Sequence, residues 1–373
     1  MDAFFSHITA LEILRRWDSG RLLRSATFVP DELIPKRMPS VAEVERITAN
    51  VRQLAGATLP LHMIVSSDAG RHRSKLAVAH IALKRYPENS HVRLTPNVAC
   101  ASPELVALQM TEYATETELL MLVDELCGYY GIQPIAKSGL VKREEPLTSV
   151  SRISSFLDEL GPVRGTRKLR RVLQHARDRS GSPQESRTCH RFELDMRHGG
   201  YDIKVVGLND PVAVERAGAI LGEAAQRIRK PDIILLAPDH AGDAPTPFKA
   251  VAVDYQGAYH RDEQQESKDI NRRNELLARD IKDYEIAKEH YDDIAYLDWL
   301  ARCIRHDLGL PEPVLTEQES RLWAERKAGL NARLARADGL HWTNRDPPLV
   351  MSGARDFDGE TVGAGTLSPA VAQ

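Results

Sequence analysis

Cysteine is scarce in this sequence, and its spacing excludes two common uses of the residue. The 373 residues include 4 cysteines, Cys100, Cys127, Cys189 and Cys303, and no C-x-x-C pair occurs among them. His306 follows Cys303 by three residues, but a single Cys–His pair does not define a zinc site. The spacing therefore indicates neither a disulfide framework nor a cysteine-based metal centre. Scattered free thiols are typical of a reducing cytoplasm.

Long hydrophobic runs and a large net charge are also missing. No stretch approaches the ~20 apolar residues that span a membrane. The N-terminal residues mix acidic and basic side chains, whereas a secretory signal has a basic start and a long apolar core. The formal charge is −3, so any nucleic-acid-binding surface has to be local. With 42% hydrophobic and 28% charged residues, the composition predicts a globular, cytoplasmic protein without a membrane segment.

The length of the chain and a polar segment that contains Gly and Pro predict two domains. Domains of roughly 100–200 residues are usual, and residues 137–150 are polar and contain Gly and Pro, which is typical of a linker. We predict an α/β fold, α+β overall, with the following parts: a small α+β domain over 1–136, a linker over 137–163, a second domain over 164–311, a charged helix over 312–341 and a disordered tail over 342–373.

Local patterns predict several elements within these parts. Helical spacing of apolar residues indicates a helix over residues 4–17. Ser40 and Glu43 form a capping box that opens a helix reaching to about Leu54. Ser182, which is followed by proline and then Glu185, caps a further helix.

Residues 231–260 predict a β-hairpin that brings two acids together. Two short apolar runs flank a loop rich in Gly, Pro and Asp. If Ala237 pairs with Lys249 across the loop, the same register places Asp232 opposite Asp254. Two carboxylates at that separation repel each other unless a proton or a cation lies between them. Mg²⁺ or Mn²⁺, which take oxygen ligands, would resolve the repulsion, whereas two solvated strand-end acids remain the alternative.

The motifs around this hairpin resemble those of a known family. A helix that begins S-P-x-E is followed by Pro-Asp, by a strand ending in an acid with the pattern Tyr-x-Gly-x-x-His, and by D-x-x-R. This order resembles the nuclease-like domains related to the very short patch repair endonuclease, within the PD-(D/E)xK superfamily. The resemblance covers about residues 165–310 and implies a restriction-endonuclease-like mixed sheet flanked by helices. It implies the following residues: Glu185, Asp232 and Asp254 as metal ligands, His260 as a catalytic group, and Asp269 and Arg272 as the distal motif positions.

The sequence departs from this family at two positions. Gln256 stands two residues after the central acid, where the pattern has Lys or, in many relatives, an acid, and Asp254 stands where Glu is usual. A lysine would orient the attacking water and neutralise charge on the phosphate, but an amide only forms hydrogen bonds. Gln256, as part of the catalytic set, would ligate metal or hold the water. Reduced activity, or none, is consistent with this substitution. For Asp269 and Arg272 we favour an ion pair that positions their helix.

A basic stretch precedes the hairpin region. Its cations lie in a helical pattern with a narrow apolar stripe, and those expected to contact DNA are Arg164, Arg167, Lys168, Arg170 and Arg171. A basic helix face of this kind would follow the phosphate backbone without reading bases. A solvated helix face with no ligand is the alternative.

The N-terminal region resembles a second group of proteins. The segments SHITAL at 6–11 and SPEL at 102–105 are similar to the region that precedes such domains in proteins likened to AbiEi-type antitoxins, which bind DNA. This resemblance implies a toxin as a partner. The sequence thus predicts divalent-metal-dependent hydrolysis of DNA. The alternatives are a catalytically inactive DNA-binding regulator or antitoxin-like protein, and an interaction module without a nucleic-acid role. The oligomeric state is left open.

Overall fold

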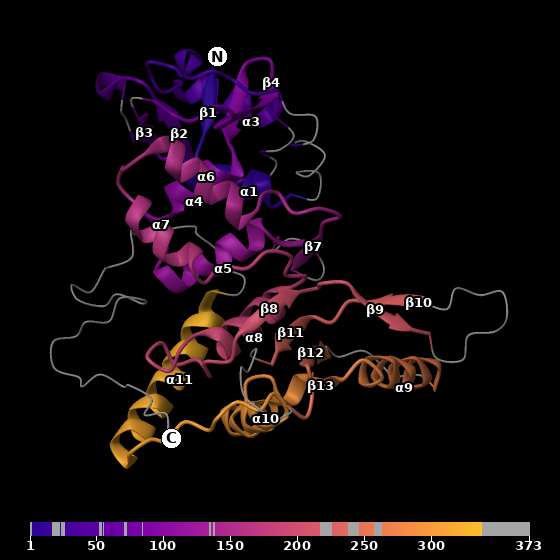
Figure 1. The fold of residues 1–373 in the computed structure, drawn as a ribbon. Helices are drawn as coiled ribbons and strands as arrows, with labels where there is room; N and C mark the ends of the chain where they lie inside the picture. Colours follow the sequence, from indigo (N-terminus) through magenta and orange to yellow (C-terminus); the bar gives the residue numbers. More distant parts are fainter. Residues whose placement is uncertain are drawn as a thin grey trace. The chain divides into compact units, whose positions relative to one another are not determined.

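The protein is described here from a computed structural model. It describes residues 2–337 apart from 17–22, 24–26, 52–53, 55, 71–72, 84, 134–135, 137–138, 217–225, 238–245 and 257–262, and for 263–268 it describes the backbone alone. The chain forms two compact units, the first built on Met1–Asp178 and the second on Arg179–Ala335. Both combine helices with β-sheet, so the predicted mixed α/β class is confirmed (Figure 1). Among the described residues, no helix has the length and apolarity needed to cross a membrane.

The first unit contains a five-stranded sheet with the order β3-β2-β1-β5-β4. Its strands are β1 (Ala3–Phe5), β2 (Leu61–Val65), β3 (Ala77–Ile81), β4 (His91–Thr95) and β5 (Val98–Ala101). Two short helices adjoin this sheet: α1 (His7–Leu14) and α3 (Val41–Asn50), the latter with the predicted capping box of Ser40 and Glu43. The single helix predicted over 4–17 is wrong at its start, because Phe4 lies in the fully buried strand β1.

The rest of the first unit is mainly helical. Its elements are α4 (Pro103–Met110), α5 (Glu116–Leu126), β6 (Tyr130–Ile132), β7 (Leu140–Lys142), α6 (Val150–Leu160) and α7 (Thr166–Leu173). The range predicted as a linker, 137–163, therefore contains a strand and a helix, and α6 buries Ile153, Phe156 and Leu157. The basic helix α7 also belongs to this unit, which extends to Asp178. The organisation differs from the predicted one because an amphipathic helix follows the polar Gly/Pro segment directly.

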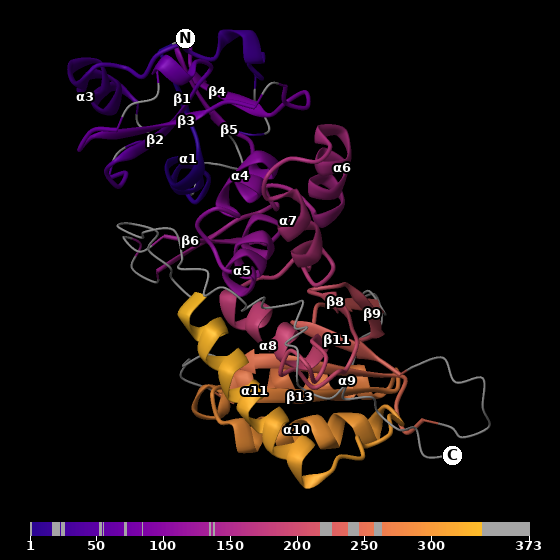
Figure 2. The same ribbon diagram turned by 90° about the vertical axis from the view of Figure 1, so that its left-hand side faces the viewer.

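The second unit is a four-stranded mixed sheet, order β13-β12-β11-β8, with helices on both faces. Its elements are α8 (Pro183–Glu193), β8 (Val205–Leu208), β9 (Val212–Glu215), β10 (Gln226–Arg229), β11 (Ile233–Leu236), β12 (Ala250–Gln256), α9 (Glu263–Leu277), β13 (Ile281–Ala287), α10 (Ile294–Asp307) and α11 (Glu317–Ala337). Strand β12 pairs antiparallel with β11 and parallel with β13, so α9 is the crossover between two parallel neighbours (Figure 1). Figure 2 shows α9, β11 and β13 after a turn of 90°.

Alternation along the strands assigns each face its own core. Val251 and Val253 of β12 pack in the larger core with Phe192 of α8 and Ile304 of α10. On the other face, Ala250 and Ala252 pack with Leu276 of α9. Because successive side chains of a strand point to opposite faces, Asp254 and Gln256 lie on the α9 face. The tail over 342–373 lies outside the described residues.

A buried ion pair connects the sheet-containing part of the first unit with its helical part. Arg15, directly after α1, donates to Glu125 of α5 through Nε at 2.9 Å and Nη2 at 2.6 Å. The Glu125 side chain is fully buried, and it also accepts the Ile132 backbone N–H at 2.9 Å. Arg143 donates to the Glu125 carbonyl oxygen at 2.8 Å.

We expect Glu125→Ala to destabilise the protein strongly. Removing one partner of a buried ion pair leaves the other charge without compensation, which costs about 3–5 kcal/mol. Urea denaturation measures the change. The matched control is Asp2→Ala, which breaks the exposed pair between Asp2 and Arg46 (3.4 Å) and should cost less than about 1 kcal/mol. Equal losses in the two variants would contradict the role assigned to Glu125.

Candidate active site

The hairpin of the second unit has the predicted register. Ile233 lies opposite Val253, and the Ala237 N–H donates to the Lys249 carbonyl at 3.0 Å. One step beyond the first of these pairs, Asp232 and Asp254 stand opposite each other at the open end. The pairing follows from the two apolar runs, which have to bury matching faces on both sides of the sheet.

Asp232 and Asp254 are locked together by two reciprocal hydrogen bonds. Asp254 Oδ1 accepts the Asp232 backbone N–H at 2.8 Å, and Asp232 Oδ2 accepts the Tyr255 backbone N–H at 2.8 Å. Each carboxyl group is therefore directed at the backbone of the other strand, and the two are held beside each other.

Glu185 reaches the same place from helix α8. It is 9% exposed and accepts the Gly181 backbone N–H at 2.7 Å and the Ser182 hydroxyl at 3.0 Å, so the predicted cap by Ser182 is confirmed together with this contact. Asn209, just after β8, links the helix to the hairpin. Its side chain donates to Glu185 Oε2 at 2.7 Å, and its backbone N–H donates to the Asp232 carbonyl at 3.1 Å.

Helix α9 places a cation on this cluster. Arg272 donates through Nη2 to Asp254 Oδ2, and its Nε lies 3.8 Å from Asp283 Oδ2 on β13. The Asp283 side chain is 2% exposed, and its Oδ1 has no hydrogen-bond partner among the described residues. The structure thus places Arg272 at the central acid, and the predicted ion pair between Arg272 and Asp269 stays a prediction. A second pair, Arg273 with Glu285 at 2.7 Å, holds α9 to β13 nearby.

The cluster has more acids than cations, and several of its acids have raised pKa values. Burial, together with the charges of Glu185 and Asp254, raises the pKa of Asp232 to about 8. Burial and the charge of Asp254 raise the pKa of Asp283 to about 8. The pKa of Glu185 is also raised, first by burial and then by the charge of Asp254. A site that holds protons near neutral pH because its acids are buried and, to a smaller extent, repel each other has the electrostatics of a cation-binding site.

Of the two remaining residues of the predicted catalytic set, Gln256 and His260, the structure describes only Gln256. Gln256 is the last residue of β12 and lies two residues after Asp254, on the same face of the strand. His260 lies outside the described residues, and its place relative to the cluster stays a prediction.

The cations predicted to contact DNA are in the first unit, where most of them have partners of their own. Arg164 lies 3.2 Å from Glu112, and Arg170 lies 2.8 Å from Asp158. Arg171 pairs with Glu116, a residue with a 5% exposed side chain.

Lys168 and Arg167 complete this helix. Lys168 Nζ donates to the Thr111 carbonyl at 3.0 Å and to that of Ala114, so it caps the end of α4. Arg167 is exposed. The sequence showed the cations but not the acids on neighbouring helices that pair with them, so much of the basic face stabilises this unit. DNA contact by these residues stays a prediction.

The cluster in the second unit is not a preassembled three-ligand metal site. Within the described part of the chain, the histidines His7, His62 and His80 of the first unit are the ligand-type side chains whose donor atoms gather within 4.8 Å of one another. In the second unit, Asp254 is instead engaged by Arg272 and by the Asp232 N–H. A cation would have to share Asp254 with Arg272.

Sequence reasoning missed Asn209 and Asp283 as members of the cluster. The signal for Asn209 was the turn dipeptide Asn-Asp directly after an apolar run, and its backbone has the left-handed φ of +52° that Asn tolerates. For Asp283, the signal was an acid within β13 (Ile281–Ala287), where the parallel register sets it opposite Ala252.

Comparisons of this chain with protein-family models, with curated proteins and with solved structures find no match. The function is therefore argued from the site itself.

The raised pKa values of Asp232 and Asp283 predict a pH dependence of stability. An aspartate in the unfolded chain releases its proton near pH ~4, whereas these two retain theirs to about pH 8 in the folded state. The folded state therefore binds more protons across this window. The free energy of unfolding should fall as the pH rises from ~4 to ~8, by at most ~1.4 kcal/mol per pH unit for each carboxyl.

Urea denaturation in the presence of a chelator tests this dependence. Asp283→Asn should flatten the decline, because the amide does not titrate. The exposed Glu317 offers the matched control, and Glu317→Gln should keep the wild-type slope. A slope left unchanged by Asp283→Asn would show that Asp283 is ionised in the folded protein.

Proposed function

We propose that the second unit hydrolyses phosphodiester bonds with a divalent metal ion, and that its substrate is DNA. The observation that carries the proposal is the reciprocal contact of Asp232 and Asp254 at the open end of the hairpin, with Glu185 tied to the same place through Asn209. Two carboxyl groups face each other across the hairpin, and Asn209 joins a third, that of Glu185, to the Asp232 backbone.

The charge of the cluster supports a cation at this position. Arg272 contacts Asp254 and lies 3.8 Å from Asp283, and the charge of Glu185 acts on the neighbouring Asp232. One described cation thus stands against four buried or half-buried acids. Without a metal ion, protons on Asp232 and Asp283 reduce this excess of negative charge. Carboxylate oxygens are the donors that Mg²⁺ and Mn²⁺ prefer, so the donor set fits such an ion.

The proposal assigns a role in the reaction to each residue of the cluster. Asp232, Asp254 and Glu185 would hold the ion, which supplies a more acidic water and positive charge beside the scissile phosphate. Gln256, on the strand face of Asp254, would orient that water by hydrogen bonding. Arg272 provides positive charge at the site although Gln256 cannot, and a guanidinium suits the oxygens of a phosphate.

The assignment to DNA rests on the resemblance to nuclease-like domains. The mixed sheet with helices on both faces, and the three acids at one end of it, are what that resemblance implies for a restriction-endonuclease-like fold. The basic helix α7 adds less support, because several of its cations are paired within the first unit.

The second candidate is a catalytically inactive, DNA-binding regulator of the antitoxin-like kind. Two observations favour it: Gln256 lacks the charge of lysine, and the guanidinium of Arg272 already neutralises Asp254. In this alternative, Arg272 takes the place of the metal ion and the cluster is structural.

Asp254→Asn should abolish plasmid nicking in Mg²⁺ or Mn²⁺ while DNA binding, measured by gel shift, is retained. The amide is nearly isosteric but removes one anionic ligand. Asp280→Asn is the matched control, since Asp280 forms an exposed pair with Lys249 at 2.6 Å and should leave nicking unchanged. If the wild type binds DNA but never nicks it in either metal, the regulator is the correct function.

Substitution of Arg272 separates the two functions further. If Arg272 supplies positive charge to the reaction, Arg272→Ala should lower the nicking rate by ~10²-fold or more, and Arg272→Lys should recover part of it. If Arg272 instead replaces the metal ion, Arg272→Ala should tighten Mn²⁺ binding, measured by calorimetry, without producing nicking. Arg273→Ala, which breaks the neighbouring pair with Glu285, controls for loosening of α9.

A further inference from the structure

Three histidines from separate elements meet in the first unit, far along the chain from the acids discussed above. His7 is the first residue of α1, His62 lies in β2, and His80 lies in the neighbouring parallel strand β3. The pairing of β2 with β3 sets Ile64 opposite His80, so His62 is two residues away on the same face. Strand β1 is followed almost at once by α1, so His7 lies beside the sheet face that carries His62 and His80.

The ring nitrogens of these residues are within reach of one ion. One nitrogen from each ring can be chosen so that all three lie within 4.8 Å of one another. His62 Nδ1 and His80 Nε2 are 2.9 Å apart, and the rings of His7 and His80 stack with centroids 3.7 Å apart. Zinc bonds of ~2.0–2.1 Å in a tetrahedral site would set neighbouring nitrogens ~3.3 Å apart. This separation lies between the 2.9 Å of His62 and His80 and the 4.8 Å within which all three donor atoms lie.

The surroundings fix the histidines and keep them in the form that binds metal. His7 Nδ1 lies 2.9 Å from the Ser6 hydroxyl, and the His7 backbone N–H donates to Gln109 at 2.8 Å. Burial lowers the pKa of His7 well below its ordinary value and lowers that of His62 to about 4. Both rings are therefore neutral near pH 7, and each presents a lone pair. Hydrogen bonds to the second ring nitrogen are a usual feature of metal-binding histidines.

The backbone at His7 is also unusual. Its φ of +48° lies in the left-handed region, which a residue other than glycine rarely adopts at the start of a helix. The hydrogen bond from its N–H to Gln109 holds this conformation. Strain of this kind is retained where the surrounding structure requires a particular side-chain position.

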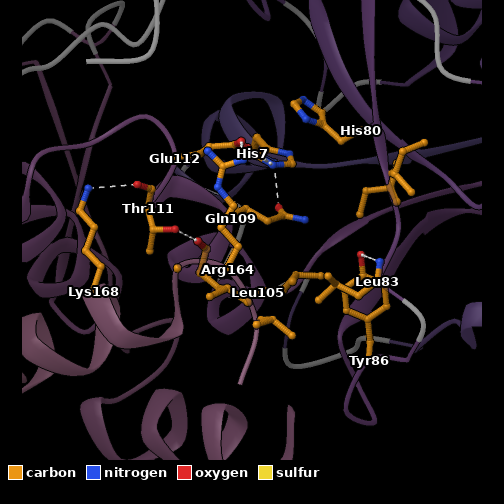
Figure 3. A pocket seen from close by; sticks show the side chains of 15 residues that line it. His7, His80, Leu83, Tyr86, Leu105, Gln109, Thr111, Glu112, Arg164 and Lys168 are labelled. Atoms are coloured by element: carbon orange, nitrogen blue, oxygen red, sulfur yellow. Dashed lines mark hydrogen bonds and ion pairs between the residues drawn. The ribbon is translucent and has the colours of Figure 1, made fainter. Parts of the chain in front are cut away.

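A cavity opens beside the histidines. It measures about 530 Å³, and His7 and His80 are part of its wall. Figure 3 shows His7 beside Gln109 and Glu112 in this cavity, and Glu112 Oε2 lies 3.8 Å from His7 Nε2. Arg164, paired with Glu112 at 3.2 Å, lines the cavity as well. Three protein ligands beside such a space leave a fourth position for water, for Glu112 or for a small ligand.

We propose that His7, His62 and His80 form a site for a divalent transition-metal ion such as Zn²⁺, open to the adjoining cavity. The nitrogen donors distinguish this site from the oxygen donors of the second unit, so the two sites should select different metals. The proposal does not depend on nuclease activity.

Metal binding to the 373-residue chain without an affinity tag tests the proposal. After treatment with a chelator, titration with Zn²⁺ by calorimetry should show one site in the wild type, and Co²⁺ should produce the visible absorption of a tetrahedral complex. His80→Ala, which removes a half-buried ligand, should weaken Zn²⁺ binding at least about tenfold and abolish the Co²⁺ spectrum. Mg²⁺ should not compete.

Two variants serve as controls. Tyr113→Phe keeps all three ligands and the ring that contacts each of them edge-on, and His306→Ala removes an exposed histidine of the second unit. Both should bind Zn²⁺ as the wild type does. Zn²⁺ should also raise the thermal midpoint of the wild type but not of His80→Ala. Absence of stoichiometric Zn²⁺ binding in the wild type, or unchanged binding in a folded His80→Ala variant, would overturn the proposal.

Discussion

Electrostatic repulsion between carboxylates is the constraint around which the second unit is arranged. The hairpin register, set by apolar burial on both faces of the sheet, forces Asp232 and Asp254 together, and α8 and β13 add Glu185 and Asp283. Backbone N–H groups, Asn209, protons and one guanidinium then compensate the charge. Stability alone would favour apolar residues at these positions, so an arrangement of this cost is typical of a functional site.

The predictable parts of this structure were those set by local rules. The register of the hairpin followed from two apolar runs and the loop between them, and the caps at Ser40 and Ser182 followed from side-chain hydrogen bonding to the first turn. The contacts of Arg272 could not be predicted, because they depend on how α9 crosses from β12 to β13. The helix predicted over 4–17 failed for a related reason. A buried strand of three residues has no period of its own, so β1 was absorbed into the helix that follows it.

The two units present opposite donor chemistries. The first gathers neutral imidazoles beside a partly apolar cavity, and the second gathers carboxylates beside a guanidinium. The histidine cluster was not visible as a sequence motif, whereas three of the acids followed from the hairpin register and from the family resemblance. His62 and His80 are brought together by parallel strand pairing, and Glu185 reaches Asp232 through Asn209. Tertiary pairing, which the sequence encodes only through burial, therefore creates both clusters.

The position of Arg272 has a consequence for motion. The same guanidinium that neutralises Asp254 also attaches α9 to the C-terminal end of β12. Any cation that draws Asp254 away from Arg272 therefore weakens one attachment of α9, while the pair of Arg273 with Glu285 and the packing of Leu276 remain. By thermodynamic linkage, a ligand that holds α9 in a displaced position would in turn increase the cation affinity of the acids. Cation binding to the carboxylates and the position of α9 would therefore be thermodynamically coupled.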